Sequence, residues 1–382
     1  MGLGWGVILL ALGVLLSGCG GSGVHFAGPV DDAFAWPTVR GANDNRGVAA
    51  GRVEAQRLIW QRKTGGEAAG EPTVRGGYLY FPGYDRRLEV FAAATGHRVF
   101  RRRYDGPVTG ALPRDTAFDF LTDQNEYRLF TYTYPPGEKR TDYRVARSQA
   151  PPRRLDDSLT LIAGLNGTLY CHADDGEIRW EVKTDGPLLT APAVVDTTIF
   201  AASGRSVVAL DTRDGELRWS HQSSGAVTAA PAVDDRVYVG TADSMIYALD
   251  RSNGGMDWFF VAGGGVFTTP AVGADRIYVA ANDGLIYALD KATGKMIWTY
   301  DTGAVANLSP TLAGDLLYVA TRTGRLVALG AADGSVVYDH KLRSAAVTPP
   351  VVAEGYVFVA DDNRRLYCFG PNTPITAENE SE

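Results

Sequence analysis

Cysteine and histidine are scarce in this sequence, which has three and five of them among 382 residues. No Cys or His pair has the close spacing of a zinc site, so a structural metal is not expected. Cys171 and Cys368 each follow a Leu-Tyr pair and so share one position of the repeat described below, in units that are not neighbours. Such positions lie beyond the roughly 7 Å Cα separation that a disulfide allows. We expect both side chains to be small buried hydrophobic groups.

An excess of basic residues is also missing. The 37 Lys and Arg against 44 Asp and Glu give a formal net charge of −7, so nucleic acid is not an expected partner. No Ser-His-Asp set, paired-carboxylate motif or phosphate-binding glycine loop stands out, and no residue is assigned a catalytic role. Helical periodicity of useful length is absent as well.

The N-terminus carries a short apolar run from Leu3 to Leu16. A membrane-spanning helix takes about 20 apolar residues, so this run is too short and is typical of a signal peptide over residues 1–18. The run ends in Leu-Ser-Gly before Cys19, which resembles a bacterial lipobox and implies that Cys19 is lipidated after cleavage. The alternative is an ordinary secretory signal with a chance cysteine, and no Lys or Arg precedes the run.

Residues 19–35 are expected to be the lipidated cysteine and a flexible tether, because Gly20-Gly21-Ser22-Gly23 is a Gly/Ser sequence. Gly20, rather than Asp, follows the cysteine. By resemblance to enterobacterial lipoproteins, this favours the outer membrane, with the chain facing the periplasm.

Two sets of residues repeat with one period of 39 to 41 residues. The first is the prolines Pro72, Pro113, Pro152, Pro192, Pro231, Pro270, Pro310 and Pro350. The second is the glycines Gly96, Gly137, Gly176, Gly215, Gly254, Gly294 and Gly334. Two markers in phase at a period near 40 are typical of the blades of a β-propeller.

Each unit contains four short strands. In one unit, residues 276–280 and 285–289 are β-branched and aromatic runs joined by an Asn-Asp-Gly turn, and a further turn leads into the strand 295–300. The proline-bearing segment supplies the fourth strand. The sequence therefore predicts an all-β, eight-bladed β-propeller with four-stranded blades over residues 36–370, and an acidic, disordered tail over residues 371–382.

Aromatic residues recur at one position of the repeat. We expect them to fill the gaps between neighbouring blades, since a cofactor box would need them to converge on one point. They are Trp60, Phe100, Trp180, Trp219, Trp258, Trp298 and Tyr338. Trp60 precedes the first proline, whereas the last unit has no Trp strand. The N-terminal strand is therefore predicted to complete the last blade, which closes the ring and removes two open sheet edges.

The second unit departs from the repeat. Aromatic residues and prolines replace the usual Ala-Leu-Asp sequence, and a basic cluster follows. This unit is the candidate partner surface, and the alternative is a divergent, solvated blade. The candidate residues are Tyr132, Tyr134, Arg140, Arg144 and Arg147.

The sequence Ile-Tyr-Ala-Leu-Asp-x-x-x-Gly-x-x-x-Trp of residues 286–298 resembles the PQQ-like β-propeller repeat, and residues 36–41 resemble that family's lead-in. One branch, the quinoprotein dehydrogenases, holds PQQ and calcium on the propeller axis and often has a disulfide of adjacent cysteines. This chain has no adjacent cysteines and no room for that branch's long inserts. The other branch is BamB, whose members are lipoproteins that help to insert outer-membrane β-barrels. No Leu-x-Leu-Arg stretch matches the BamB surface motif.

The resemblance implies a lipid-anchored, non-catalytic scaffold without a cofactor. Its expected partners are the barrel-assembly machinery and unfolded outer-membrane proteins, which could add a strand to a blade edge. One alternative is an anchored enzyme or small-ligand receptor with a site at the mouth of the central channel. Another is a general interaction propeller with a different partner.

Overall fold

The computed structural model describes residues 45–114, 117–122, 127–133 and 139–372. The signal peptide, Cys19, the tether, residues 36–41, Tyr134 and residues 373–382 of the tail lie outside these ranges. The described residues form strands and turns, and none of their segments is a helix long and apolar enough to cross a membrane.

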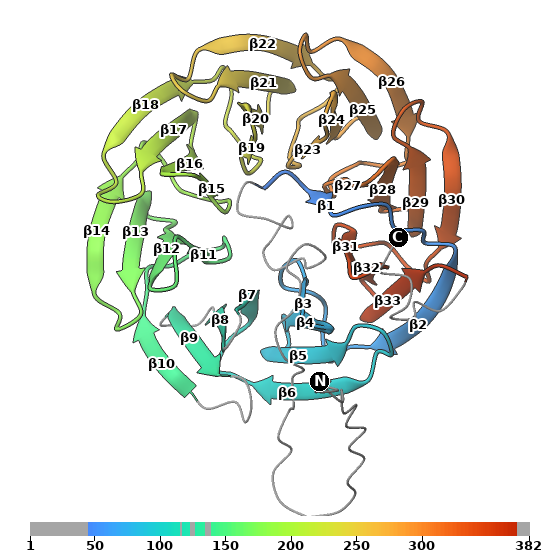
Figure 1. Ribbon diagram of the computed structural model, residues 1–382, viewed down its shortest axis with the longest axis horizontal. Coiled ribbons are helices and arrows are strands. Elements are labelled where there is room, and N and C mark those ends of the chain that lie inside the picture. Colours follow the sequence, from blue (N-terminus) through green and yellow to red (C-terminus); the bar gives the residue numbers. More distant parts are fainter. Residues whose placement is uncertain (1–44, 115–116, 123–126, 134–138, 373–382) are drawn as a thin grey trace, which may run out of the picture.

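Eight sheets stand around a central axis like the blades of a propeller (Figure 1). Blades 1 to 4 contain β3 (Thr73–Arg75), β4 (Tyr78–Gly83), β5 (Arg87–Ala92) and β6 (Arg98–Arg103); β7 (Val108–Pro113), β8 (Ala117–Thr122), β9 (Arg128–Thr133) and β10 (Lys139–Arg144); β11 (Arg153–Arg154), β12 (Leu159–Ala163), β13 (Thr168–Ala173) and β14 (Ile178–Lys183); and β15 (Ala193–Val195), β16 (Thr198–Ser203), β17 (Ser206–Asp211) and β18 (Leu217–Gln222).

Blades 5 to 8 repeat this arrangement. They contain β19 (Ala232–Val233), β20 (Arg236–Gly240), β21 (Met245–Asp250) and β22 (Met256–Val261); β23 (Ala271–Val272), β24 (Arg276–Ala280), β25 (Leu285–Asp290) and β26 (Met296–Asp301); β27 (Thr311–Ala313), β28 (Leu316–Thr321), β29 (Arg325–Gly330) and β30 (Val336–Lys341); and β31 (Val351–Ala353), β32 (Tyr356–Asp361) and β33 (Arg365–Gly370). The eight-bladed, four-stranded all-β fold expected from the sequence is confirmed.

The last blade is completed by the N-terminal strand β2 (Arg57–Lys63). It pairs antiparallel with β33, with Trp60 opposite Cys368 and Arg57 opposite Gly370. The ring is thus closed by the two ends of the chain, as the position of Trp60 in the sequence predicts. A second N-terminal strand, β1 (Val48–Ala49), pairs parallel with β27 and makes blade 7 five-stranded.

The tryptophans lie between blades, where each ring meets a turn glycine of the next blade. The Trp258 indole N–H donates to the Lys291 carbonyl at 3.0 Å, and Gly294 lies against the face of the same ring. Trp60, Trp219 and Trp298 make the same pair of contacts with the blade that follows each of them. The repeated tryptophans and the repeated turn glycines therefore form the two sides of one contact, which recurs between blades.

The remaining aromatic positions vary this contact. Trp180 lies against Gly215, but its indole N–H has no hydrogen-bond partner among the described residues. Phe100 and Tyr338 are partly buried against the blades that follow. In blade 2, Tyr143 takes the ring position and lies against Gly176.

Cys171 and Cys368 are free and buried, as expected. Burial raises the pKa of the Cys171 thiol to about 11, and it also raises the pKa of Cys368. A raised pKa favours the protonated thiol at neutral pH, which suits an apolar packing position. Both act as packing groups.

Candidate functional site

The inner side of the ring is lined in part by a short N-terminal segment of the chain. Residues 45–49, here called the axial segment, run across the inner strands before the chain turns outward to β2 (Figure 1). Asn45 is fully buried, and its side-chain N–H groups donate to the carbonyls of Ala191 at 3.1 Å and Pro231 at 3.2 Å. Its Oδ1 accepts from the guanidinium of Arg153, which is also buried.

The axial segment is tied to two further blades through its backbone. The Val272 N–H donates to the Arg46 carbonyl at 2.9 Å, and the Leu312 N–H donates to the Gly47 carbonyl at 3.0 Å. Five consecutive blades, from 3 to 7, therefore hold these few residues.

The buried polar groups around Asn45 do not form a calcium site. The polar groups that meet there, Asn45, Arg153 and backbone carbonyls, bind one another and include no carboxylate. The described part of the chain contains no group of three or more His, Cys, Asp or Glu that could hold a metal ion. Calcium sites are built mainly from several oxygen ligands, most of them carboxylates.

The candidate surface on blade 2 is only partly a surface. Tyr132 is 2% exposed and packs among Tyr104, Phe118 and Phe120, so its assignment to a partner surface is wrong. The reason is its strand: β9 lies second from the outside and is covered on both faces by neighbouring blades. The Arg102 guanidinium lies 4.9 Å from the Tyr132 ring centre.

The three arginines of the same candidate set are exposed. Arg140 and Arg144 lie on the outer strand β10. Arg147 follows it and donates from Nε to the Tyr127 hydroxyl at 2.7 Å. Tyr134 lies outside the described residues.

The outer strands also carry exposed apolar side chains, which were not singled out in the sequence. Each of five consecutive outer strands has one in its first position: Ile178, Leu217, Met256, Met296 and Val336. The strand β22 has more, because Phe259 is 52% and Val261 is 58% exposed. At the same positions β18 has Ser220 and Gln222, and β26 has Thr299 and Asp301.

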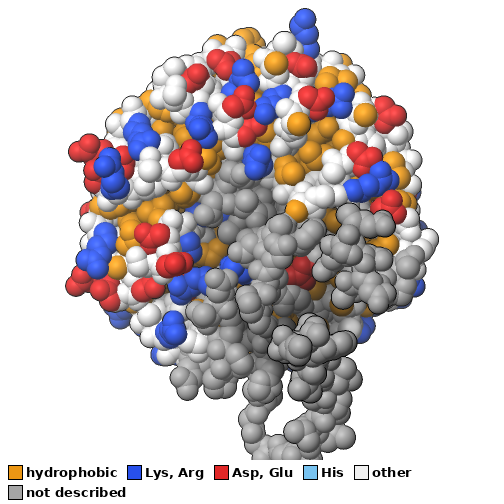
Figure 2. Space-filling model, viewed as in Figure 1, with side chains coloured by type: hydrophobic (Ala, Val, Ile, Leu, Met, Phe, Trp, Pro, Cys, Tyr) orange, Lys and Arg blue, Asp and Glu red, His pale blue; other side chains and the backbone are white. Residues whose placement is uncertain are grey.

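The strand β22 is also the edge of its sheet, since the strand order of blade 5 ends there. One side of its backbone is therefore open to a further strand. The face of the ring shown in Figure 2 has no apolar site comparable with β22, because Lys, Arg, Asp and Glu are interspersed there with smaller hydrophobic areas.

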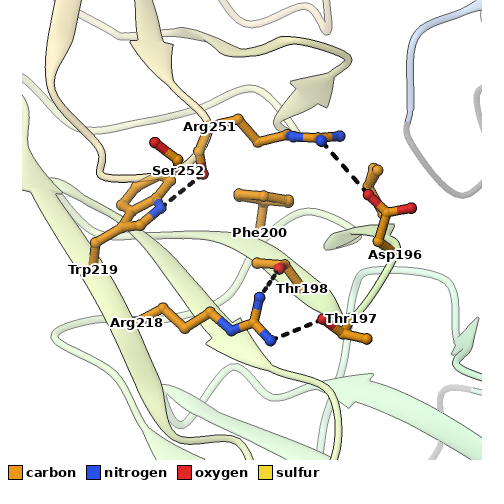
Figure 3. A pocket seen from close by; sticks show the side chains of 9 residues that line it. Asp196, Thr197, Thr198, Phe200, Arg218, Trp219, Arg251 and Ser252 are labelled. Atoms are coloured by element: carbon orange, nitrogen blue, oxygen red, sulfur yellow. Dashed lines mark hydrogen bonds and ion pairs between the residues drawn. The ribbon is translucent and has the colours of Figure 1, made fainter.

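A cavity of about 320 Å³ lies between blades 4 and 5 (Figure 3). Its cations are already paired: Arg251 lies 3.6 Å from Asp196, and Arg218 donates to Thr197 at 2.9 Å and to Asp211 at 2.7 Å. Hydrogen bonds from Arg213 and Arg218 hold the pKa of Asp211 well below its usual range. The lining has one carboxylate, that of Asp196, and no His or Cys, so it does not form a metal site, and the cavity suits a small polar molecule at most. Its residues come from three strands and two turns of blades 4 and 5, so no sequence motif marks it.

Comparison with known proteins agrees with the β-propeller fold described above. The profile of a family described as outer membrane protein assembly factor BamB matches residues 137–258, 224–311 and 302–373. Among curated proteins, no sequence matches the chain.

Three solved structures illustrate the range of similar proteins. BamB from Moraxella catarrhalis has a TM-score of 0.72 at 14% identity, covering 82% of this chain and 99% of that one. Quinohemoprotein alcohol dehydrogenase ADHIIG from Pseudomonas putida HK5 has a TM-score of 0.75 at 12% identity, covering 90% and 82%. The computationally designed Ika8 protein has a TM-score of 0.72 at 14% identity, covering 84% and 100%. At these identities the likeness shows the propeller fold alone.

Proposed function

Because the chain belongs to the family of the outer membrane protein assembly factor BamB, we propose that it is a non-catalytic propeller that binds other proteins during outer-membrane β-barrel assembly. We further propose that Cys19 anchors it by lipid to the outer membrane, facing the periplasm. Its partners are then the barrel-assembly machinery and unfolded barrel strands.

The observation that carries this proposal is the outer strand β22. It combines an open backbone edge with Met256, Phe259 and Val261, which are 49%, 52% and 58% exposed. An extended partner strand could pair with such an edge through main-chain hydrogen bonds while its side chains cover the apolar ones. Transmembrane barrel strands alternate apolar and polar residues, so they suit an edge of this kind.

The axial segment supports the non-catalytic part of the proposal. It lies on the inner strands of the ring, where the buried polar groups of Asn45 and Arg153 bind each other. Elemental and mass analysis of the purified chain tests this point. Stoichiometric calcium or a quinone would instead favour the ligand-binding alternative.

The partner is tested by crosslinking the membrane-anchored chain in its own host and identifying the captured proteins by mass spectrometry. Recovery of a barrel-assembly subunit is the expected result. Repeatable recovery of a different partner without that subunit would overturn the barrel-assembly role.

The contact strand is tested with the double variant Phe259→Ser and Val261→Gln, which gives β22 the residues of β18. Partner recovery should fall several-fold, while the free energy of unfolding should change by less than about 0.5 kcal/mol because both side chains are exposed. Ser220→Thr with Thr299→Ser, at the equivalent exposed positions of β18 and β26, is the control and should leave recovery unchanged. Equal recovery from all three chains would exclude β22 as the contact strand.

A further inference from the structure

Three consecutive outer strands form a basic surface, here called the basic wall. They are β2 of blade 8, β6 of blade 1 and β10 of blade 2. Together they carry ten basic residues and a single acidic one, Asp142, in a chain of net charge −7. The basic residues are Arg57, Arg62, Lys63, Arg98, Arg101, Arg102, Arg103, Lys139, Arg140 and Arg144.

No other part of the outer rim resembles this surface. The strand β18 has one arginine, and β22 and β26 have no basic residue. On β14 and β30, basic residues alternate with Glu181 and Asp339. The basic wall is therefore a local feature that the net charge of the chain conceals.

Internal contacts fix part of the basic wall but do not neutralise it. The buried carboxylate of Glu89 lies 2.9 Å from Arg98 and 3.3 Å from Arg101. The side chain of Arg62 donates to the Gly96 carbonyl at 2.9 Å, which carries no net charge. Arg103 and Arg140 are exposed, and neither forms an ion pair within the described part of the chain. Most of the positive charge thus remains at the surface.

The basic wall lacks the anchors of a protein–protein interface. Of the large hydrophobic side chains exposed in the described ranges, only Leu58 lies on these three strands. Stable protein interfaces are depleted of charge at their centre and depend on buried aromatic or aliphatic anchors. Guanidinium groups without such anchors suit a surface of phosphates, to which arginine donates two parallel hydrogen bonds.

The shape of the ring favours a flat partner. The outer wall is convex, and β6 lies between β2 and β10 (Figure 1). This middle strand has four of the ten basic residues, more than either neighbour. A convex wall meets a plane along its middle strand, so the highest charge lies where contact would be closest.

We propose that the basic wall docks on the anionic phospholipid headgroups of a membrane and holds the ring edge-on to it. The strand β22 lies on the side of the ring opposite β6, so it then faces away from the membrane (Figure 1). The inference rests on the membrane anchoring proposed above. It assigns a second membrane contact, which does not depend on the acyl chains attached to Cys19. A polybasic surface adds electrostatic attraction to anionic lipids, so it would also fix the orientation of an anchored chain on the membrane.

The test uses the chain from residue 19 onward with Cys19→Ser, so that neither the apolar run from Leu3 to Leu16 nor an acyl chain contributes to binding, and vesicles of phosphatidylcholine with or without phosphatidylglycerol. Phosphatidylglycerol should raise the partition coefficient measured by flotation, and added salt should reverse the increase. A basic residue near an anionic surface contributes a factor of about five. Arg102→Gln, Arg103→Gln and Arg140→Gln together should therefore lower binding at least about ten-fold.

Two control chains separate charge from folding. The same three positions changed to Lys keep their charge and should keep most of the binding. Arg179→Gln, Arg213→Gln and Lys295→Gln remove equal charge from other exposed positions and should have little effect. Equal loss in this last chain, or equal binding to both kinds of vesicle, would overturn the proposal. Binding to polyglutamate but not to phosphatidylglycerol vesicles would assign the basic wall to an acidic protein and overturn it as well.

Hydrogen exchange gives a second readout. Anionic vesicles should slow exchange at residues 98–103 and leave residues 256–261 unchanged, and the reverse pattern would contradict the proposal. Loss of partner capture with unchanged vesicle binding would count against the proposed function alone. Vesicle binding that fails while partner capture persists would count against the basic wall alone.

Discussion

The contact between Trp258 and Gly294 places two separate demands on one residue. Gly294 has φ +70°, a left-handed conformation that side chains disfavour. A Cβ at this position would lie 2.5 Å from Cε3 of the Trp258 ring, well inside van der Waals contact. The glycine is therefore required both by its own turn and by the neighbouring blade, which explains why the glycine and tryptophan markers keep one period.

Gly294→Ala should lower the free energy of unfolding by about 2 to 4 kcal/mol, because the strain of positive φ adds to overpacking against Trp258. Gly303→Ala is the matched control. Gly303 has φ +74°, but a Cβ there would meet only one atom, at 4.0 Å. It should cost about 1 kcal/mol from backbone strain alone. Denaturant unfolding of both variants measures the difference, and equal losses would show that the ring contact contributes nothing.

Residue roles could be predicted from the sequence only where the repeat constrains them. Trp219 and Trp298 recur in phase, so their burial between blades follows from the period. Tyr132 lies in the unit that departs from the repeat, and basic residues follow it. Nothing in its local sequence shows that β9 is covered on both faces, so the sequence predicts a surface residue where the structure has an aromatic core residue.

Among the elements, the axial segment shows how tertiary context creates structure that no local pattern marks. β1 has two residues, and it exists because the inner strand β27 offers an open edge to it. The strand β2 differs: seven residues with a repeat-like Trp60 predict both its existence and its partner. The open edge of β22 follows from the predicted blade, but its apolar character appears only when its outward residues are compared with those of β18 and β26.

Asn45→Ala tests the axial segment. The substitution removes two hydrogen bonds to backbone carbonyls and one from Arg153, all in a fully buried place. We expect the free energy of unfolding to fall by about 2 to 4 kcal/mol, because buried polar groups left without partners are costly. Asn363→Ala, at an exposed turn, should change it by less than about 0.5 kcal/mol. An equally small change in the free energy of unfolding for Asn45→Ala would mean that the hydrogen bonds of Asn45 do not stabilise the ring.

For the whole molecule, ring closure depends on one pairing between distant parts of the chain. Trp60 belongs to β2, yet its indole N–H donates to the Ala93 carbonyl of blade 1 at 2.8 Å and its ring lies 6.0 Å from that of Phe358 in blade 8. It therefore binds the last blade to the first. Period, blade count and closure were all predictable from the sequence, because they depend on markers spaced along it. The basic wall was predictable only in part: β6 and β10 belong to consecutive units, but β2 joins them only through ring closure.

Trp60→Ala and Trp258→Ala should each cost about 3 to 5 kcal/mol, since both rings are buried and make the same inter-blade contact. Their association should differ. Loosening β2 exposes the edge of β33 and weakens the seam, so Trp60→Ala should form oligomers at concentrations where Trp258→Ala stays monomeric. Light scattering after size-exclusion chromatography makes the comparison. Identical profiles would show that the seam is no weaker than any other blade contact.

The pairing of β2 with β33 also determines when the ring can close, because the two strands lie near opposite ends of the described chain. β2 is made before the other strands of the eight four-stranded blades, but its partner, residues 365–370, is made last among the described strands. Until then Leu58, Ile59 and Trp60 form an apolar strand with no place to pair. Contacts between such distant residues form slowly, and the waiting strand is open to wrong partners. The ring is therefore completed only when residues 365–370 are present to pair with β2, and a chain cut short before residue 365 never completes it.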